Sequence, residues 1–288
     1  MYQAGLVLEG GGMKGIYTAG VLDFFLDRGM DFSMIYGVSM GAVNMCSYLT
    51  KQRGRARDVI VDYVGMKHYC SIESLVFTGD VFNEDMCYHL IPDYLYPYDK
   101  EAFDKYEGRA YSVATDIYSG MPEYFRITDL KEDVDKVRAS ASLPLVARNV
   151  EINGRLYLDG GLSDSIPLGK SILDGNRKNI VVMTKEIGFI RKITSMPQLA
   201  LIKARYYKYP KVYELMAERH ISYNATLDFI ERQVDNGQAF VIRPKHKSEV
   251  GRLEKDRDKL MELYDEGYQE AADSYDELLL YLNDSNKD

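Results

Sequence analysis

The stretch Ala4-Gly5-Leu6-Val7-Leu8-Glu9-Gly10-Gly11-Gly12-Met13-Lys14-Gly15 opens the pattern that determines the fold. Its apolar run ends at a glycine triplet, as a buried parallel strand does when it enters a turn. Helical spacing of apolar residues follows over 16–28, and Gly29 lies where a helix cap belongs. A second strand over 32–36 and a second helix over 42–49 repeat this order. The pattern predicts an α/β fold with three layers, a parallel sheet covered by helices on both faces.

The remainder of the chain divides at about residue 185. We expect short helices and loops in the tyrosine-rich part from 51 to 108, and the Asn153-Gly154 pair predicts a β-hairpin between 149 and 158. After residue 188 the pattern is mostly helical. The sequence therefore predicts an α/β domain over 1–185 and a mostly helical C-terminal extension over 186–288. Further expected elements are strands at 110–115, 123–127, 180–184 and 239–243, and a helix at 130–141.

Composition excludes several classes of protein. The chain has 288 residues, of which 46% are hydrophobic, and its net charge of -8 argues against binding to a nucleic-acid backbone. Its three cysteines, Cys46, Cys70 and Cys87, form no C-x-x-C pair, so neither a disulfide framework nor a metal site is expected. The N-terminal residues lack the pattern of a signal peptide, and we expect a cytoplasmic location.

The glycine loop of residues 10–15 has two interpretations. Glycines let consecutive backbone N–H groups converge on one negatively charged oxygen at the start of a helix. Gly10, Gly12 and Gly15 also satisfy G-x-G-x-x-G, and Asp31 follows at roughly the distance of a ribose-binding acid. Taken alone, the loop fits an oxyanion hole or a dinucleotide cradle.

A second glycine motif, Gly37-Val38-Ser39-Met40-Gly41, is the G-x-S-x-G pattern of a nucleophile elbow. It lies between a predicted strand and a predicted helix, where the flanking glycines allow close crossing and expose the serine hydroxyl. Ser39 is therefore the candidate nucleophile.

A serine nucleophile needs a base within hydrogen-bond reach. Asp159-Gly160-Gly161 ends a predicted strand and can present a carboxylate there. The alternative is a histidine, as in the Ser, Asp, His order of α/β-hydrolases, but the elbow comes too early in the chain for that fold. We therefore expect Asp159 to act as the base. The histidines, which lack supporting motifs, are His68, His89, His220 and His246.

In these motifs the chain resembles the patatin-like phospholipases, acyl hydrolases with a Ser/Asp dyad and no catalytic histidine. The likeness covers about residues 4–185, and the last hundred residues resemble extensions of bacterial members. It implies a Ser39/Asp159 dyad and favours the oxyanion interpretation of the glycine loop; no cofactor is implied. Val38 departs from the family's usual threonine. The matching segments are Gly10 to Gly15 with Lys14 as the basic residue, Gly37 to Gly41, Ala139-Ser140-Ala141-Ser142-Leu143-Pro144, and Asp159-Gly160-Gly161.

The expected substrate is a fatty-acyl ester of a lipid, with its carbonyl oxygen facing the N–H groups of Gly11 and Gly12. The tyrosine-rich segment 63–106 is a candidate acyl pocket or lid. Residues 203–211, with four cations among tyrosines, could contact a membrane surface. The alternatives are a soluble short-chain esterase or thioesterase, a non-catalytic lipid-binding or scaffold protein, and, more distantly, a nucleotide-binding enzyme. The sequence does not indicate an oligomeric state.

Overall fold

A computed structural model describes residues 1–284, and a mixed eight-stranded sheet forms its centre. Five strands run parallel in the order β3-β2-β1-β7-β8, while β4 and β6 pair antiparallel with β3, and β5 continues beyond β6. The strands are β1 (Tyr2–Leu8), β2 (Phe32–Val38), β3 (Arg109–Asp116), β4 (Pro122–Ile127), β5 (Val150–Ile152), β6 (Arg155–Asp159), β7 (Asn179–Val182) and β8 (Ala239–Ile242).

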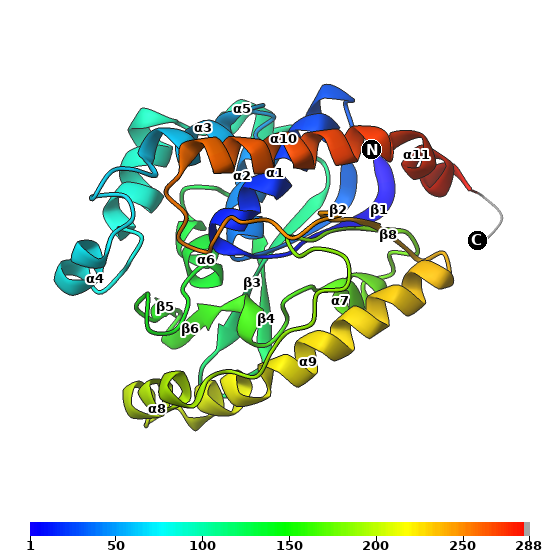
Figure 1. The fold of residues 1–288 in the computed structure, drawn as a ribbon. Helices are drawn as coiled ribbons and strands as arrows, with labels where there is room; N and C mark the ends of the chain where they lie inside the picture. Colours follow the sequence, from blue (N-terminus) through cyan, green and yellow to red (C-terminus); the bar gives the residue numbers. More distant parts are fainter. Residues whose placement is uncertain (285–288) are drawn as a thin grey trace.

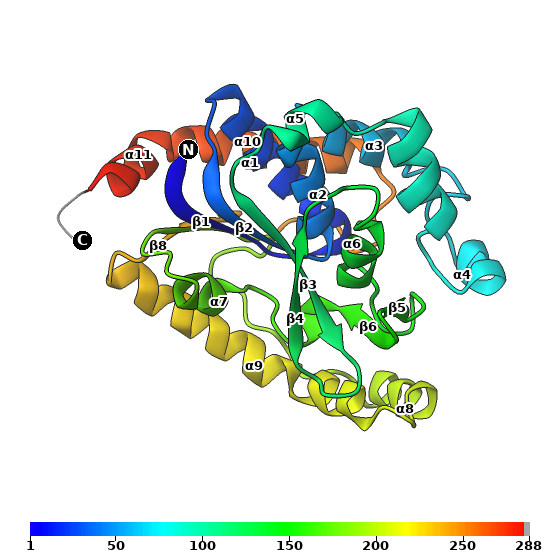
Figure 2. The same ribbon diagram turned by 180° about the vertical axis from the view of Figure 1, so that it is seen from behind.

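Helices cover both faces of this sheet, as Figure 1 and the reverse view in Figure 2 show. Alternate residues of β1 explain why: Leu6 and Leu8 pack with one helical layer, whereas Val7 packs with the other. The first layer contains α1 (Ile16–Asp27), α2 (Met40–Leu49) and α10 (Arg257–Asp273). The second contains α7 (Leu168–Leu173) and α9 (Pro210–Asp235).

Short helices fill the remaining connections, including the tyrosine-rich part. Figure 1 shows α4 at the side of the molecule, away from the sheet. These elements are η1 (Gly12–Gly15), α3 (Arg55–Tyr63), α4 (Ile72–Thr78), the π-helix η2 (Met86–Leu95), α5 (Lys100–Asp104), α6 (Val134–Ser140), η3 (Gly160–Leu162), α8 (Met196–Arg205) and α11 (Tyr275–Asn283).

The predicted three-layer α/β fold is confirmed, and its sheet is mostly parallel with antiparallel strands at one end. Two hairpins supply the antiparallel strands. One turns at Gly120 and joins β3 to β4; the other turns at Asn153 and Gly154, both with positive φ, and joins β5 to β6. The sequence indicates the second hairpin but not that it would add to the end of the parallel sheet.

The segment after residue 185 contributes to the same sheet and the same core. Strand β8 pairs parallel with β7, and α10 packs against α1 at two glycines. A Cβ on Gly20 would lie 2.1 Å from the Tyr264 carbonyl oxygen, and one on Gly267 would lie 2.1 Å from that of Tyr17. Only glycine at both positions permits this close contact between the helices.

Candidate active site

Ser39 lies at the carboxyl end of β2, immediately before α2. Its backbone has φ 55° and ψ -125°, a conformation that residues other than glycine rarely adopt and that is typical of strained functional turns. The flanking glycines make the turn possible. A Cβ on Gly37 would lie 2.6 Å from the Ala42 Cα, and one on Gly41 would lie 2.5 Å from the Leu8 carbonyl oxygen. The predicted elbow geometry is thus present.

Asp159 lies close to Ser39 because of the register of β3. Strand β2 pairs with β3 as far as Val38 opposite Val113, and β6 pairs with β3 from the other direction, with Asp159 opposite Ala114. Strand β4 pairs with the opposite edge of β3. The carboxyl ends of β2 and β6 therefore approach each other along one edge of β3, which brings the serine and the carboxylate together.

The segment that joins α6 to the next loop holds both residues in place. The Ser39 N–H donates to the Ser140 Oγ over 2.8 Å, and the Asp159 N–H donates to the Ser142 carbonyl oxygen over 2.8 Å. Thr115 also donates its hydroxyl to the Asp159 carbonyl oxygen. The Ala-Ser-Ala-Ser block, which the sequence linked to the site only through resemblance, thus has a direct positioning role.

The Asp159 carboxylate is only 1% exposed and is incompletely hydrogen-bonded. Its Oδ1 accepts the Gly161 N–H over 2.7 Å, but its Oδ2 has no partner among the described residues. Burial raises the pKa of Asp159 above its ordinary value, although the nearby Ser39 hydroxyl and the charge of Arg219 oppose this shift. An aspartate with a raised pKa and a free oxygen beside a serine is suited to accept the serine proton.

Glycines at 160 and 161 are required by close contacts. A Cβ on Gly160 would lie 2.1 Å from the Val113 carbonyl oxygen. One on Gly161 would lie 2.9 Å from both the Asp159 Oδ1 and an Arg219 Nη2 atom. The second glycine therefore leaves room for a guanidinium group beside the carboxylate.

The glycine loop packs directly against Ser39. A Cβ on Gly10 would lie 2.6 Å from the Ser39 Cβ, and one on Gly11 would lie 2.6 Å from the Thr184 Oγ1. The N–H groups of Gly10 and Gly11 make no hydrogen bond within the described residues, and Gly12, with φ 59°, begins η1, where the first N–H groups lack partners within the turn. These unpaired donors line the same small space as Ser39.

The other three residues predicted for the loop have different surroundings. Met13 is fully buried in the core and its N–H donates to the Arg252 carbonyl oxygen over 3.1 Å, so this donor is already occupied. Lys14 is half-buried in the last turn of η1. A Cβ on Gly15 would overlap the Met40 side chain at 2.3 Å, so this glycine permits contact with the residue after the nucleophile.

The buried carboxylate of Glu9, which sequence reasoning did not single out, helps to hold the glycine loop through Thr184. Glu9 is 2% exposed and accepts hydrogen bonds from the Thr184 N–H, over 2.7 Å, and from the Tyr223 hydroxyl, over 2.5 Å. Thr184 also donates to the Gly10 carbonyl oxygen over 2.8 Å. A charged residue at the end of an otherwise apolar strand was the available signal.

An apolar cavity of about 220 Å³ opens beside Ser39. Parts of the tyrosine-rich segment form its wall, together with residues that follow α6. Its apolar lining includes Val43, Val59, Tyr69, Phe82, Ile91, Leu143, Val146 and Met216. The tyrosine-rich segment therefore contributes side chains to a cavity at the nucleophile.

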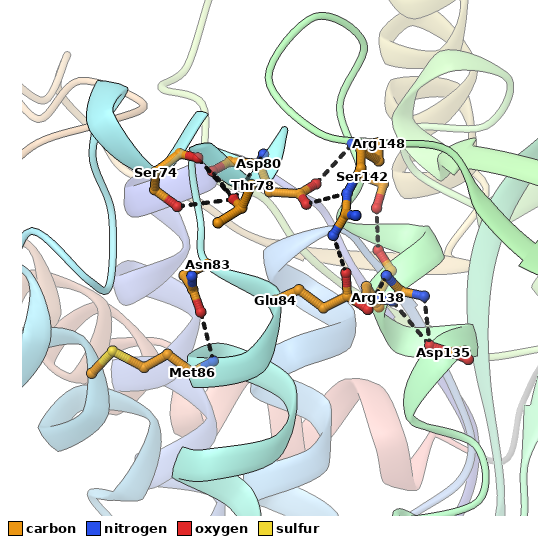
Figure 3. Close-up of polar contacts among 10 residues, drawn as sticks. All are labelled: Ser74, Thr78, Asp80, Asn83, Glu84, Met86, Asp135, Arg138, Ser142 and Arg148. Carbon is orange, nitrogen blue, oxygen red and sulfur yellow. Dashed lines mark hydrogen bonds and ion pairs between the residues drawn. The ribbon is translucent and has the colours of Figure 1, made fainter. Parts of the chain in front are cut away.

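Ion pairs fasten the outer part of this wall to the body of the molecule (Figure 3). The Arg148 Nε contacts the Asp80 Oδ2 at 2.8 Å, and the Arg148 N–H donates to the other oxygen of the same carboxylate. Glu84 binds both Arg148 and Arg138 at 2.5 Å, and Arg138 also pairs with Asp135 on α6. This network, which we call the rim clamp (Asp80, Glu84, Asp135, Arg138 and Arg148), connects residues near α4 and η2 with the segment beside the dyad.

A second, much smaller cavity adjoins the first and also borders Ser39. This polar chamber has a volume of about 30 Å³. Ser39, Gly12, Leu143, Arg219 and Arg252 border both spaces. The chamber is lined by Glu9, Gly10, Gly11, Gly12, Val38, Ser39, Leu143, Asp159, Gly161, Ser165, Lys185, Arg191, Arg219 and Arg252.

Other candidate groups lie elsewhere. None of the four histidines borders either cavity in the described part of the chain, and residues 1–284 contain no cluster of three or more side chains suited to a metal ion. No helix within that range combines the length and apolarity needed to cross a bilayer. In the predicted membrane patch, Lys203, Arg205, Tyr207, Lys208 and Lys211 are exposed, but Tyr206 is buried and Tyr209 packs on Tyr118.

Parts of the chain match known protein families. Residues 6–170 match the family model described as patatin-like phospholipase, and residues 209–283 match a model described as a domain of unknown function, DUF6363. The uncharacterized protein YjjU of Escherichia coli is 32% identical over 188 residues, which cover 62% of this chain and 51% of YjjU.

Two further relatives have names that refer to lipids. The probable lipid hydrolase 463L of invertebrate iridescent virus 6 is 24% identical over 62% of this chain and 66% of its own length. The lysophospholipase NTE1 of Candida glabrata is 26% identical over 57% of this chain but only 9% of its own length. The chain thus spans about half of YjjU and less than two thirds of 463L.

The family match covers more than half of the chain. It includes the glycine loop, the Ser39 elbow, the block around Ser140 and Asp159, all of which meet at one site. The chain therefore belongs to the patatin-like phospholipase family.

Proposed function

We propose that this protein is a serine acyl hydrolase that cleaves fatty-acyl esters of lipids through Ser39 and Asp159. The observation that carries the proposal is the buried Asp159 Oδ2, which lacks a hydrogen-bond partner beside a serine held at an elbow. A buried carboxylate oxygen without a partner is costly to stability, so its placement is better explained by chemistry than by structure.

In the proposed reaction, the Ser39 Oγ attacks the ester carbonyl carbon while its proton moves to the Asp159 Oδ2. The N–H groups of the glycine loop stabilise the oxyanion, with an effect on the order of 3 kcal/mol for each donor. The alcohol leaves with the proton from Asp159, and an acyl-serine remains. Asp159 then accepts a proton from water, the hydroxide attacks the acyl carbon, the proton returns to the Ser39 Oγ, and the fatty acid departs.

The apolar cavity favours a substrate with a long acyl chain, because this cavity opens beside Ser39. Most of its lining is aliphatic and aromatic, although Asp80, Glu84 and Arg138 also border it. The apolar part favours burial of a hydrocarbon at about 25 cal/mol for each Å² removed from water. A short-chain esterase or thioesterase would not need such a cavity. Comparison of acetyl and dodecanoyl esters of the same alcohol separates the two activities, and we expect the higher kcat/KM for the longer chain.

Peripheral contact with a membrane is also proposed. Exposed apolar side chains precede the cations of residues 203–211, namely Ile190, Ile193, Met196 and Leu201. Together they form an amphipathic segment of the kind found at bilayer interfaces. Sedimentation with anionic vesicles should fall when Met196 and Leu201 are replaced by serine; unchanged sedimentation would exclude this segment as the contact.

A fluorophosphonate probe tests the dyad. The wild-type protein should be labelled at Ser39, which peptide mass spectrometry locates, and labelling should be lost in Ser39→Ala and strongly slowed in Asp159→Asn. Ser195→Ala, at an exposed serine outside the site, is a matched serine control and should still be labelled. A folded wild-type protein that resists the probe would instead favour the non-catalytic lipid-binding or scaffold interpretation.

A further inference from the structure

Strand β8 is an open edge of the central sheet. It pairs parallel with β7, and no other strand of residues 1–284 pairs with its far side. The Met183 N–H donates to the Ile242 carbonyl oxygen over 2.9 Å, so the backbone groups of Ile242 face β7. Because backbone groups of alternate residues in a strand point to opposite edges, the N–H and C=O of Val241 face away from β7. An exposed edge of this kind is a template for a further strand.

A groove of about 600 Å³ lies along this edge. Its walls come from helices on both faces of the sheet, α9 on one face and α10 with α11 on the other, and both views of the ribbon place β8 between α9 and α10 (Figure 1 and Figure 2). Its lining shares no residue with either cavity at Ser39. Neighbouring strands lie about 4.8 Å apart, so a strand added to β8 would lie between the two helical layers.

The two walls of the groove differ in chemistry. The α9 wall contributes the apolar residues Ile230 and Val234, and Val234 is 42% exposed. Ile187, which is 58% exposed, adds a further apolar side chain. The opposite wall contributes no apolar side chain from α10 or α11 to the described lining; its residues there are Glu270, Asp273, Ser274 and Glu277.

The charge of the groove is unbalanced. Five carboxylates line it against two cations, Arg243 and Lys245, which lie 4.0 Å from Glu231 and 3.9 Å from Asp273. Within the part of the chain that the structure describes, Asp235 and Glu277 have no cation within ion-pair distance. A cationic occupant is therefore favoured, whereas a second copy of this chain would present the same acidic walls and be repelled. The five carboxylates belong to Glu231, Asp235, Glu270, Asp273 and Glu277.

We propose that the β8 edge is a docking site for an extended segment of a partner protein in which lysine or arginine alternates with apolar residues. Side chains of a strand point alternately to its two faces, so the apolar residues would cover Val234 on α9 while the cations face Glu277 on the opposite wall. The outward N–H and C=O of Val241 would bond to the backbone of the segment. This proposal is independent of the proposed hydrolase function.

A labelled peptide of alternating lysine and valine tests the site by fluorescence anisotropy. We expect saturable binding to the wild-type protein that weakens as salt is added, and no binding of a peptide with glutamate in place of lysine. The lysine peptide with every backbone nitrogen methylated keeps its charge but lacks N–H donors, so it should bind at least about fivefold more weakly. Equal binding of the methylated peptide would overturn strand addition, and failure of the lysine peptide to bind the folded protein would overturn the site.

Variants of the protein separate the backbone from the charges. Val241→Pro removes the outward N–H without breaking a hydrogen bond to β7, and proline is tolerated on the open side of an edge strand. It should weaken peptide binding about fivefold relative to Val241→Ala, which keeps the N–H. Glu277→Gln should weaken binding about twofold to fourfold, and Glu262→Gln, at an exposed carboxylate of α10 outside the groove, is the matched control.

Sedimentation of the protein alone tests the competing occupant. A wild-type dimer that becomes monomeric in Val241→Pro would assign the β8 edge to a second copy of this chain and overturn the proposal of a basic partner. Circular dichroism shows whether Val241→Pro folds. If it does not, the comparison of the methylated and unmethylated peptides on the wild-type protein decides the proposal.

Discussion

The two cavities that meet at Ser39 differ in almost every property. The apolar cavity is the larger, and most of its walls come from residues 12–147 together with a few later side chains. The polar chamber is small, and its four cations come from residues after 182, although Arg219 and Arg252 border both spaces. The dyad itself lies within the part that matches the patatin-like model. The contrast teaches that the candidate reacting groups and the cations beside them come from different parts of the chain.

The largest expected effect falls on the proposed dyad, whose Ser39 borders both cavities and whose Asp159 borders the polar chamber. Asp159→Asn removes the proton acceptor, and we expect kcat to fall by about 10³- to 10⁴-fold for esters of every chain length and head group. In the wild-type protein the base must be ionised, so kcat/KM should decrease as the pH falls through the raised pKa of Asp159, above the ordinary value of 3.8. A pH profile of the wild-type protein measures the pH dependence, and single-turnover assays of Asp159→Asn measure the loss of kcat. Loss confined to one class of substrate would contradict a shared dyad.

The second effect concerns stability and belongs to the polar chamber alone. The ordinary pKa of lysine is 10.5, and burial lowers the pKa of Lys185 to about 8. This difference corresponds to a free-energy cost of roughly 3 kcal/mol for keeping Lys185 charged in the folded protein. Because the folded-state pKa is lowered, this cost is full below about pH 8 and disappears as the pH rises toward 10.5. Lys185→Met should therefore raise the free energy of unfolding at pH 7 by up to about 3 kcal/mol, while Lys208→Met, on the surface, should not. Urea denaturation at pH 7 measures the difference, and a destabilised Lys185→Met protein would refute the burial argument.

The third effect sharpens the role of the apolar cavity. Ala147 borders this cavity and is not fully buried, so Ala147→Phe should fill part of the space without disrupting the core. We expect kcat/KM for dodecanoyl esters to fall about tenfold relative to acetyl esters. This change corresponds to a difference of about 1.4 kcal/mol in activation free energy. Ala204→Phe on the exposed side of α8 is the control. Equal losses for both chain lengths would assign the acyl chain to another space.

The smallest effect is expected at the rim clamp. Arg148→Gln removes ion pairs to Asp80 and Glu84, but the Arg148 side chain is half exposed, so the expected loss of stability is about 1 kcal/mol or less. Opening of residues 64–98 should nevertheless become easier. Relative to the wild-type protein, hydrogen exchange in Arg148→Gln should become faster in residues 64–98 than in α9. An identical change in both regions would indicate global destabilisation instead.

Sequence reasoning could single out the candidate dyad because the structural requirements around it are local. The G-x-S-x-G turn needs glycines beside Ser39, and Asp159 is followed by glycines that avoid the Val113 backbone and Arg219. Such requirements leave a signature within a few residues. The three-layer α/β architecture was predictable for the same reason, from strands and helices that alternate in the first fifty residues.

The residues that sequence reasoning missed act over long separations. Lys185, Arg191, Arg219 and Arg252 lie in four segments with no fixed spacing, and only the packing of α9 and of the loop before α10 brings them to one chamber. The pairing of β6 with the edge of β3 vacated by β2 also depends on register between distant strands. Neither arrangement has a local pattern that could be read in the chain.

The contact of Arg252 with the glycine loop has a consequence for the timing of synthesis. The Met13 N–H is bonded to the Arg252 carbonyl oxygen, and α1, which follows the loop, packs against α10 through Gly20 and Gly267. A nascent chain exposes its nucleophile early but gains these supports only after Arg252 and Gly267 have emerged. The order of translation thereby delays completion of the site until residues more than two hundred positions after Ser39 have been made.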